Sequence, residues 1–130
     1  NQRNQLQIFR YADVLLMVAE AKLRLTTPDV AGALLLVNQL RAARGTTPLA
    51  AITLVNPANV YDPGTLLAER AREMYWESWR RQDLIRFGVF TKPWTLKEAD
   101  TDPLRNLLFP IAPDELLANP NLKQNPGYGE

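Results

Sequence analysis

The chain has 130 residues, of which 46% are hydrophobic and 22% are charged, and these proportions are typical of a single globular domain. Its fifteen Lys and Arg residues are interleaved with fourteen Asp and Glu residues, so the net charge of +1 gives no concentrated positive field with which to bind nucleic acid. Because Cys and His are both absent, the sequence excludes disulfides, thiolate nucleophiles, imidazole bases and almost every zinc site.

The first apolar pattern predicts a helix over residues 10–25. Apolar residues recur there at helical spacing, and others lie outside that stripe, so we expect the helix to pack on more than one side. The stripe consists of Tyr11, Val14, Leu15, Val18 and Leu25.

A second helix is predicted to start at Thr27-Pro28-Asp29. Thr27 can cap the free N–H groups of the first turn, Pro suits the first helical position, and Gly45 ends the helix. The two segments form a hairpin whose start repeats after about 34 residues, the period of a tetratricopeptide unit. Such units are stable only when stacked, so we expect neighbouring units to come from sequence outside this chain.

A third, longer helix is predicted after a loop. Residues 46–61 are interrupted by Pro and are expected to form a connecting loop that can hold a short extended piece at residues 49–55. Asp62-Pro63 then repeats the signal for a helix start and predicts a helix over residues 63–87, with Gly88 as its stop.

The remainder of the chain is expected to be irregular. Residues 91–106 are predicted to be loop, and residues 107–111 are expected to be extended because nearby Pro residues deny them a helix. Pro113–Ala118 can form a brief helix, and the Pro-rich residues 119–130 are expected to wrap the surface. The predicted fold is therefore all-α, with a tetratricopeptide-like hairpin, a long third helix and an irregular C-terminal segment.

The predicted third helix carries Glu69, Glu73 and Glu77 on one face. Carboxylate metal sites in helical bundles also need Glu-x-x-His partners, so no metal site is predicted. Glycoside hydrolysis needs two carboxyl groups about 5 to 9.5 Å apart across an open cleft, and nothing in the sequence marks one, so no catalytic residue is assigned. A structural ion-pair network is favoured, with bonds from Glu69 to Arg72 and from Glu77 to Arg80 and Arg81. The network is predicted to comprise Glu69, Glu73, Glu77, Arg81, Asp83 and Arg86.

Aromatic side chains are the usual platform for sugar rings, and residues in loops are more available for this role than residues in helices. Trp76 and Trp79 lie in the predicted helix and are expected to belong to the core. Phe90 is a further candidate. Trp94 and Tyr61 lie in predicted loops and are taken as the candidate ligand-binding residues.

Five segments, in this order and spacing, resemble the C-terminal signature of the SusD/RagB family. They are RYADVLLM at residues 10–17, VNQLRAARG at 37–45, ERAREMYWE at 69–77, RQDLIRFG at 81–88, and FPI at 109–111 followed by NPNL at 119–122 and QNPGY at 124–128. On this resemblance, residues 1–130 are the C-terminal helical part of a longer member, part of an α-α superhelix. The Asn-Pro-Gly-Tyr ending is expected to close over the charged side chains of the third helix.

The resemblance implies a non-catalytic protein, lipid-anchored at the outer face of the outer membrane of a Gram-negative cell. Members bind oligosaccharides, or in some cases peptides or glycoprotein glycans, and deliver them to a TonB-dependent porin of the SusC type. No cofactor is expected. The lipid anchor and much of the ligand platform lie in the front portion of family members, so no ligand residue is carried over by position. A peptide-binding module of tetratricopeptide-like type remains the first alternative, and an enzyme the second.

Overall fold

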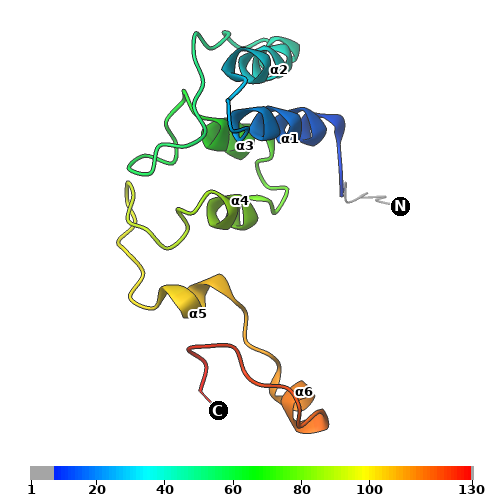
Figure 1. The fold of residues 1–130 in the computed structure, drawn as a ribbon, viewed down its shortest axis with the longest axis vertical. Helices are drawn as coiled ribbons and strands as arrows, with labels where there is room; N and C mark the ends of the chain where they lie inside the picture. Colours follow the sequence, from blue (N-terminus) through cyan, green and yellow to red (C-terminus); the bar gives the residue numbers. More distant parts are fainter. Residues whose placement is uncertain (1–7, 130) are drawn as a thin grey trace, which may run out of the picture.

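The computed structural model describes residues 8–129 and contains six helices there, spread along a long axis (Figure 1). They are α1 (Tyr11–Leu23), α2 (Val30–Ala43), α3 (Leu66–Glu73), α4 (Arg80–Arg86), α5 (Pro103–Leu107) and α6 (Pro113–Ala118). Within this part of the chain there is no β-strand, only two isolated bridges, which confirms the all-α prediction. None of the helices described is long and apolar enough to cross a membrane.

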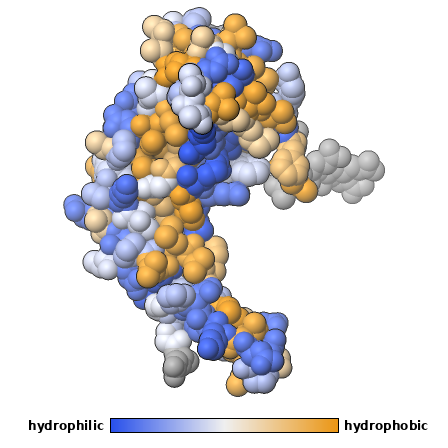
Figure 2. All heavy atoms as spheres, in the orientation of Figure 1, coloured by the Kyte–Doolittle hydropathy of each residue, from blue (hydrophilic) through white to orange (hydrophobic). Residues whose placement is uncertain are grey.

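The first two helices form the predicted hairpin, and α1 also contacts α3, so it packs on more than one side as expected (Figure 1). Ala19 of α1 and Ala33 and Val37 of α2 are fully buried in one core. The buried face is not the predicted stripe, however, since only Leu15 of that stripe is buried. The other stripe residues, Tyr11, Val14, Val18 and Leu25, are exposed. Apolar residues accordingly remain on the visible surface over α1 and α2 (Figure 2).

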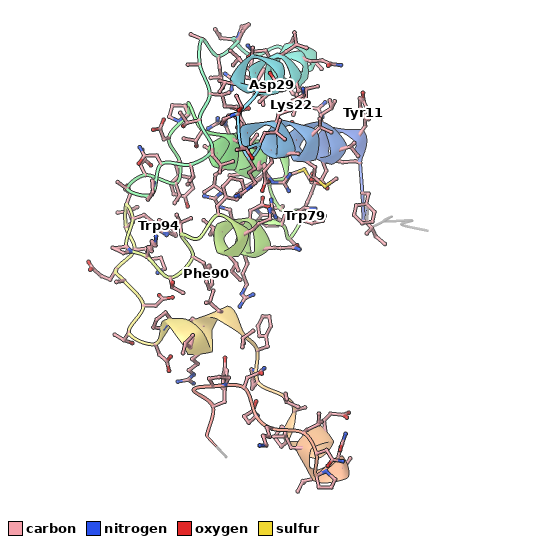
Figure 3. The ribbon with its side chains drawn as sticks, viewed as in Figure 1. Tyr11, Lys22, Asp29, Trp79, Phe90 and Trp94 are labelled. Carbon is pink, nitrogen blue, oxygen red and sulfur yellow. The ribbon has the colours of Figure 1, made fainter. Side chains whose placement is uncertain are left out.

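Helix α2 begins with a side-chain cap, but the capping residue is Asp29 rather than Thr27 (Figure 3). One Asp29 carboxylate oxygen accepts the Gly32 N–H at 2.8 Å, and the other accepts a hydrogen bond from Lys22 Nζ at 2.6 Å. The prediction of Thr27 was wrong because the helix starts at Val30, so Asp29 is the residue whose side chain reaches the first free N–H groups.

The helix predicted over residues 63–87 is wrong, because the structure has two helices there. Between α3 and α4 lies a turn in which Trp76 and Ser78 have left-handed φ angles of 63° and 65°, which a right-handed helix cannot include. Within this turn the carboxylate of Glu77 accepts hydrogen bonds from Arg10 Nε at 3.0 and 2.8 Å. The break is thus held by a contact between two residues that are 67 positions apart in the sequence. Helical periodicity, a local signal, does not reveal such a contact.

The preceding loop sets the start of α3. The Thr53 carbonyl accepts the N–H of Leu66 at 2.9 Å, and the Thr65 hydroxyl caps the helix. Thr53 and Thr65 form a parallel bridge, which confirms the short extended piece expected within residues 49–55. The helix therefore begins at Leu66 and not at Pro63.

The C-terminal region forms an arm that leads away from the first four helices (Figure 1). The loop expected over residues 91–106 ends earlier, because Asp102 caps α5 by accepting the Arg105 N–H at 3.1 Å. The prediction of an extended segment over residues 107–111 was wrong at Leu107, which is the last residue of α5, and the chain leaves the helix at Leu108, whose backbone is extended. Helix α6 confirms the brief helix at Pro113–Ala118.

The end of the chain folds back on this arm. Tyr128 donates its hydroxyl to the Arg105 carbonyl at 2.9 Å, and the Gln124 side chain bonds both the N–H and the carbonyl of Ile111 at 2.8 and 2.9 Å. Neither α5 nor α6 has a buried residue. The expectation that the ending closes over the charged third helix was wrong, because its hydrogen-bonding groups are used within the arm.

A buried guanidinium joins three helices. Arg70 of α3 donates from Nη1 to Asp13 of α1 and from Nε to Asp83 of α4, each at 2.9 Å. All three side chains are 1% exposed. Since an unpaired buried charge costs several kcal/mol, this geometry requires all three partners together.

The network continues outward from Asp83 through a second guanidinium. Arg86 donates to the other Asp83 oxygen at 2.7 Å and to both Glu20 oxygens at 2.9 Å, and Arg24 donates to Glu20 at 2.9 Å. Burial alone would raise the pKa of Glu20, but the hydrogen bonds and positive charges of Arg86 and Arg24 outweigh it, so this pKa is lowered from 4.5.

The replacement Arg70→Met in the intact protein is expected to lower the free energy of unfolding by about 3–5 kcal/mol, because it leaves Asp13 buried without its cation and Asp83 with Arg86 alone. The matched control is Arg72→Met in the same helix, where the side chain is 44% exposed and the expected loss is below about 1 kcal/mol. Chemical denaturation measures both. Equal losses for the two variants would contradict the structural role given to Arg70.

The lowered pKa of Glu20 makes part of the stability depend on pH. A carboxylate with a depressed folded pKa contributes stability that is present above its unfolded pKa, here 4.5, and that is lost as the pH falls through the folded pKa. The stability difference between the wild type and Glu20→Gln should therefore be constant above about pH 6 and shrink steadily below about pH 4.5. Denaturation curves over this range test it, and a difference that grows on acidification would be inconsistent with the ion pairs.

Candidate functional site

An open cleft lies where α3 ends and α4 begins. Its volume is about 380 Å³, within the range of small-molecule sites. It is lined by Tyr61, Arg70, Ala71, Met74, Tyr75, Trp76, Ser78, Arg80 and Asp83. Three of its nine lining residues are aromatic, so the cleft offers flat apolar faces beside a few polar groups.

The left-handed turn presents two of these aromatic rings to solvent. Tyr75 is 72% exposed and Trp76 is 87% exposed, and their ring centroids lie 6.0 Å apart. For a residue other than Gly the left-handed conformation costs about 1–2 kcal/mol, so it persists only where other contacts hold it. The bonds from Arg10 to Glu77, the residue after Trp76, supply such a contact.

The two predicted ligand-binding residues meet at one side of the cleft. Tyr61 is 54% exposed and lines the cleft, and the ring of Trp94 meets it edge-on at 5.9 Å. Trp94 is half-buried, is not among the lining residues, and donates its indole N–H to the Val89 carbonyl at 3.2 Å. The structure thus brings the pair together, with Trp94 behind Tyr61, and their role in binding stays a prediction.

The remaining aromatic candidates divide between core and surface. Trp79 and Phe90 are half-buried and pack against the core, so the expectation for Trp79 is confirmed (Figure 3). The expectation that Trp76 belongs to the core was wrong, because the turn between α3 and α4 points its ring outward. Tyr75 was not among the candidates, and no local signal marks it, since the sequence around it has helical character.

A second cavity, of about 470 Å³, is lined by the glutamates of α3 and the following turn. Each of these carboxylates is held by at least one arginine. The pairs are Glu69 with Arg41 and Arg72, Glu73 with Arg10 and Arg44, and Glu77 with Arg10. The Arg44 hydrogen bond is the largest influence on Glu73, and with Arg10 it holds the pKa of this carboxyl below its ordinary value.

Several details of the predicted charge network are corrected. Glu69 is bonded to Arg72 as predicted, but the pairs from Glu77 to Arg80 and Arg81 were wrong, because the helix is broken at Glu77. Arg81 instead donates to backbone carbonyls of the arm, one of them that of Asn106 at 2.8 Å. The bonds of Asp83 and Arg86 run to other helices, as expected for residues that tie helices together.

This arrangement of charges favours a structural role over catalysis. A general acid for glycoside cleavage needs a carboxyl group with a raised pKa, whereas the pKa of Glu73 is lowered. Among residues 8–129, no group of three or more acidic side chains is arranged to hold a metal ion. The aromatic cleft is therefore taken as the candidate site for a ligand.

Comparisons with known proteins agree with the motifs noted in the sequence. The model of the SusD family, SusD_RagB, matches residues 1–128. SusD-like protein P38 of Formosa agariphila is 34% identical over 125 residues, which make up 93% of this chain but 24% of that protein's length. No solved structure matches the chain. Because the family model matches nearly the whole chain, we conclude that the chain belongs to the SusD family.

Proposed function

We propose that the intact protein captures oligosaccharides without cleaving them and passes them to a TonB-dependent transporter of the SusC type. Membership of the SusD family supports a role in nutrient binding. The observation that carries the proposal is the open aromatic cleft beside glutamates that are all held by arginines. The cleft offers a surface on which a sugar can bind. The neighbouring carboxylates are each paired with an arginine, which favours a structural role for them over one as general acid or base.

The composition of the cleft suits a sugar ring. The apolar C–H face of a pyranose packs against a flat aromatic ring, while its hydroxyl groups need polar partners nearby. Trp76 and Tyr75 supply exposed rings, and Tyr61 supplies a ring with a hydroxyl group. We propose that Tyr61 contacts the ligand directly and that Trp94 acts by holding Tyr61 from behind.

The remaining helices serve as scaffold in this proposal. The hairpin of α1 and α2 is taken as a tetratricopeptide-like unit of an α-α superhelix, to which other parts of the intact protein contribute further units. The exposed side chains of Val14 and Val18 on α1 support this, because stacked units bury such faces. A lipid anchor in another part of the polypeptide would hold the protein at the outer face of the outer membrane.

A peptide-binding module is the second candidate, because α2 has an apolar groove. This groove, of about 640 Å³, is lined mainly by Ala31, Leu34 and Leu35, and Leu35 is exposed. Helical repeat proteins use such surfaces for peptides. Binding on a glycan array without binding to a peptide library would favour the first proposal, and the reverse result would favour this one.

The intact protein is expected to bind an oligosaccharide in isothermal titration calorimetry without releasing new reducing ends over a long incubation. The variants Glu73→Gln and Glu77→Gln should also release none, because neither carboxylate acts on the ligand. If the wild type released reducing ends and a folded Glu73→Gln variant did not, the proposed function would be wrong and the protein would be an enzyme.

A further inference from the structure

We propose that the cleft selects acidic sugars, with Trp76 stacking on the ring and Arg80 receiving its carboxylate or sulfate group. This inference rests on the proposed function and specifies the class of ligand. Three features support it, namely the charge of the cleft, the fixed position of the Arg80 guanidinium and the outward position of the Trp76 ring.

One positive charge of the cleft, that of Arg80, has no direct ion-pair partner in the part of the chain that the structure describes. Arg70 and Asp83 are bonded to each other, and both are almost completely buried. Among residues 8–129, Arg80 has no carboxylate within ion-pair distance. Its guanidinium donates hydrogen bonds to two backbone carbonyls, those of Leu67 and Val60, each at 3.2 Å. The Tyr61 side chain and the more distant charge of Asp83 also favour its protonated form. The cleft therefore carries a net charge of about +1 beside its aromatic rings.

Partial burial of Arg80 makes binding of an anion at this position more favourable. Desolvation is the largest influence on Arg80 and lowers its pKa from the ordinary value, although a guanidinium stays protonated in proteins. An arriving anion would replace some of the lost hydration and form charge-assisted hydrogen bonds, which are about twice as strong as neutral ones. A neutral hydroxyl group would offset much less of this cost.

The guanidinium of Arg80 is already held in place for this contact. Two of its donors are engaged by the carbonyls of Val60 and Leu67, and its Cζ lies 5.2 Å from the centre of the Tyr61 ring. A guanidinium has five N–H donors in a rigid planar fork, so donors remain for two oxygens of a carboxylate or sulfate. Because the group is ordered before binding, little side-chain entropy is lost when the ligand arrives.

Trp76 supplies the stacking face at the edge of the same cleft. Its ring is 87% exposed although its backbone has a left-handed φ of 63°, which an apolar side chain rarely adopts. The bonds from Arg10 to Glu77 hold this turn, so they act as positioning contacts for the ring. Strain of this kind often marks functional sites, and here it places a large aromatic surface beside the unneutralised guanidinium.

The first test is an array of paired glycans presented to the intact protein. Suitable pairs are de-esterified and fully methyl-esterified oligogalacturonate, and chondroitin sulfate and unsulfated chondroitin, with alginate against starch and xylan as further probes. The protein should bind an acidic member at least about tenfold more tightly than its neutral counterpart, the effect of about 1.4 kcal/mol. Equal or tighter binding of the neutral members would overturn the inference.

The second test separates ligand contact from folding. Trp76→Gly removes the ring but suits the left-handed backbone, so it should weaken binding of the best acidic probe at least about tenfold while keeping or raising the melting temperature. Leu96→Gly at φ 67° is the matched control, because it removes an exposed apolar side chain from the same backbone conformation outside the cleft, and its affinity should be unchanged. Undiminished affinity in Trp76→Gly, or a large loss of stability that places the ring in an interior contact, would overturn the inference.

The third test concerns the guanidinium. Arg80→Gln should reduce the ratio of the affinity for the acidic glycan to the affinity for its neutral counterpart to about one. This ratio does not depend on how much of the variant is folded. Arg81→Gln is the control, because Arg81 contacts the arm and does not line the cleft, and it should keep the wild-type ratio. A protein that binds only neutral glycans would refute acidic selection and leave the proposed function standing, whereas a protein that binds no glycan would refute both.

Discussion

The guanidinium of Arg70 is the interaction on which the rest of the structure depends. It is 1% exposed and bonded to one carboxylate of α1 and one of α4, so the helix that carries it cannot move relative to either neighbour without leaving a charge unpaired. Arg70 also lines the aromatic cleft. The bonds that join the three helices therefore fix the floor of the cleft, and the position of α4 fixes Arg80 at its side.

The guanidinium of Arg10 likewise braces the turn that carries the aromatic rings. Arg10, which directly precedes α1, is bonded to Glu73 at the end of α3 and to Glu77 within the turn. These glutamates therefore pair with arginines that hold the helices and the turn in place. The neighbouring cleft offers aromatic rings and the charge of Arg80 to a ligand. The lowered pKa of Glu73 suits a carboxylate that braces the structure rather than a general acid, and it supports the proposal of binding without turnover.

Local signals predicted much of the fold. The hairpin, the brief helix at Pro113–Ala118 and the bond from Glu69 to Arg72 follow from helical spacing, Pro and Gly positions and short-range pairs. The break between α3 and α4 could not be predicted, because it depends on Arg10, a residue far away in sequence. This error also concealed the candidate site, since a continuous helix gives no reason for Tyr75 and Trp76 to be exposed. Of the aromatic residues that line the cleft, Tyr61 alone was predicted to bind ligand, from its place in a predicted loop, whereas Trp76 was assigned to the core.

A crystal structure of the intact protein with a bound oligosaccharide tests the central claim most directly. The account predicts a sugar ring against Trp76 and Tyr61, with Glu69, Glu73 and Glu77 still paired with their arginines and outside contact distance of the ligand. A glutamate released from its arginine and pointing at the glycosidic oxygen, or coordinating a metal ion, would contradict it.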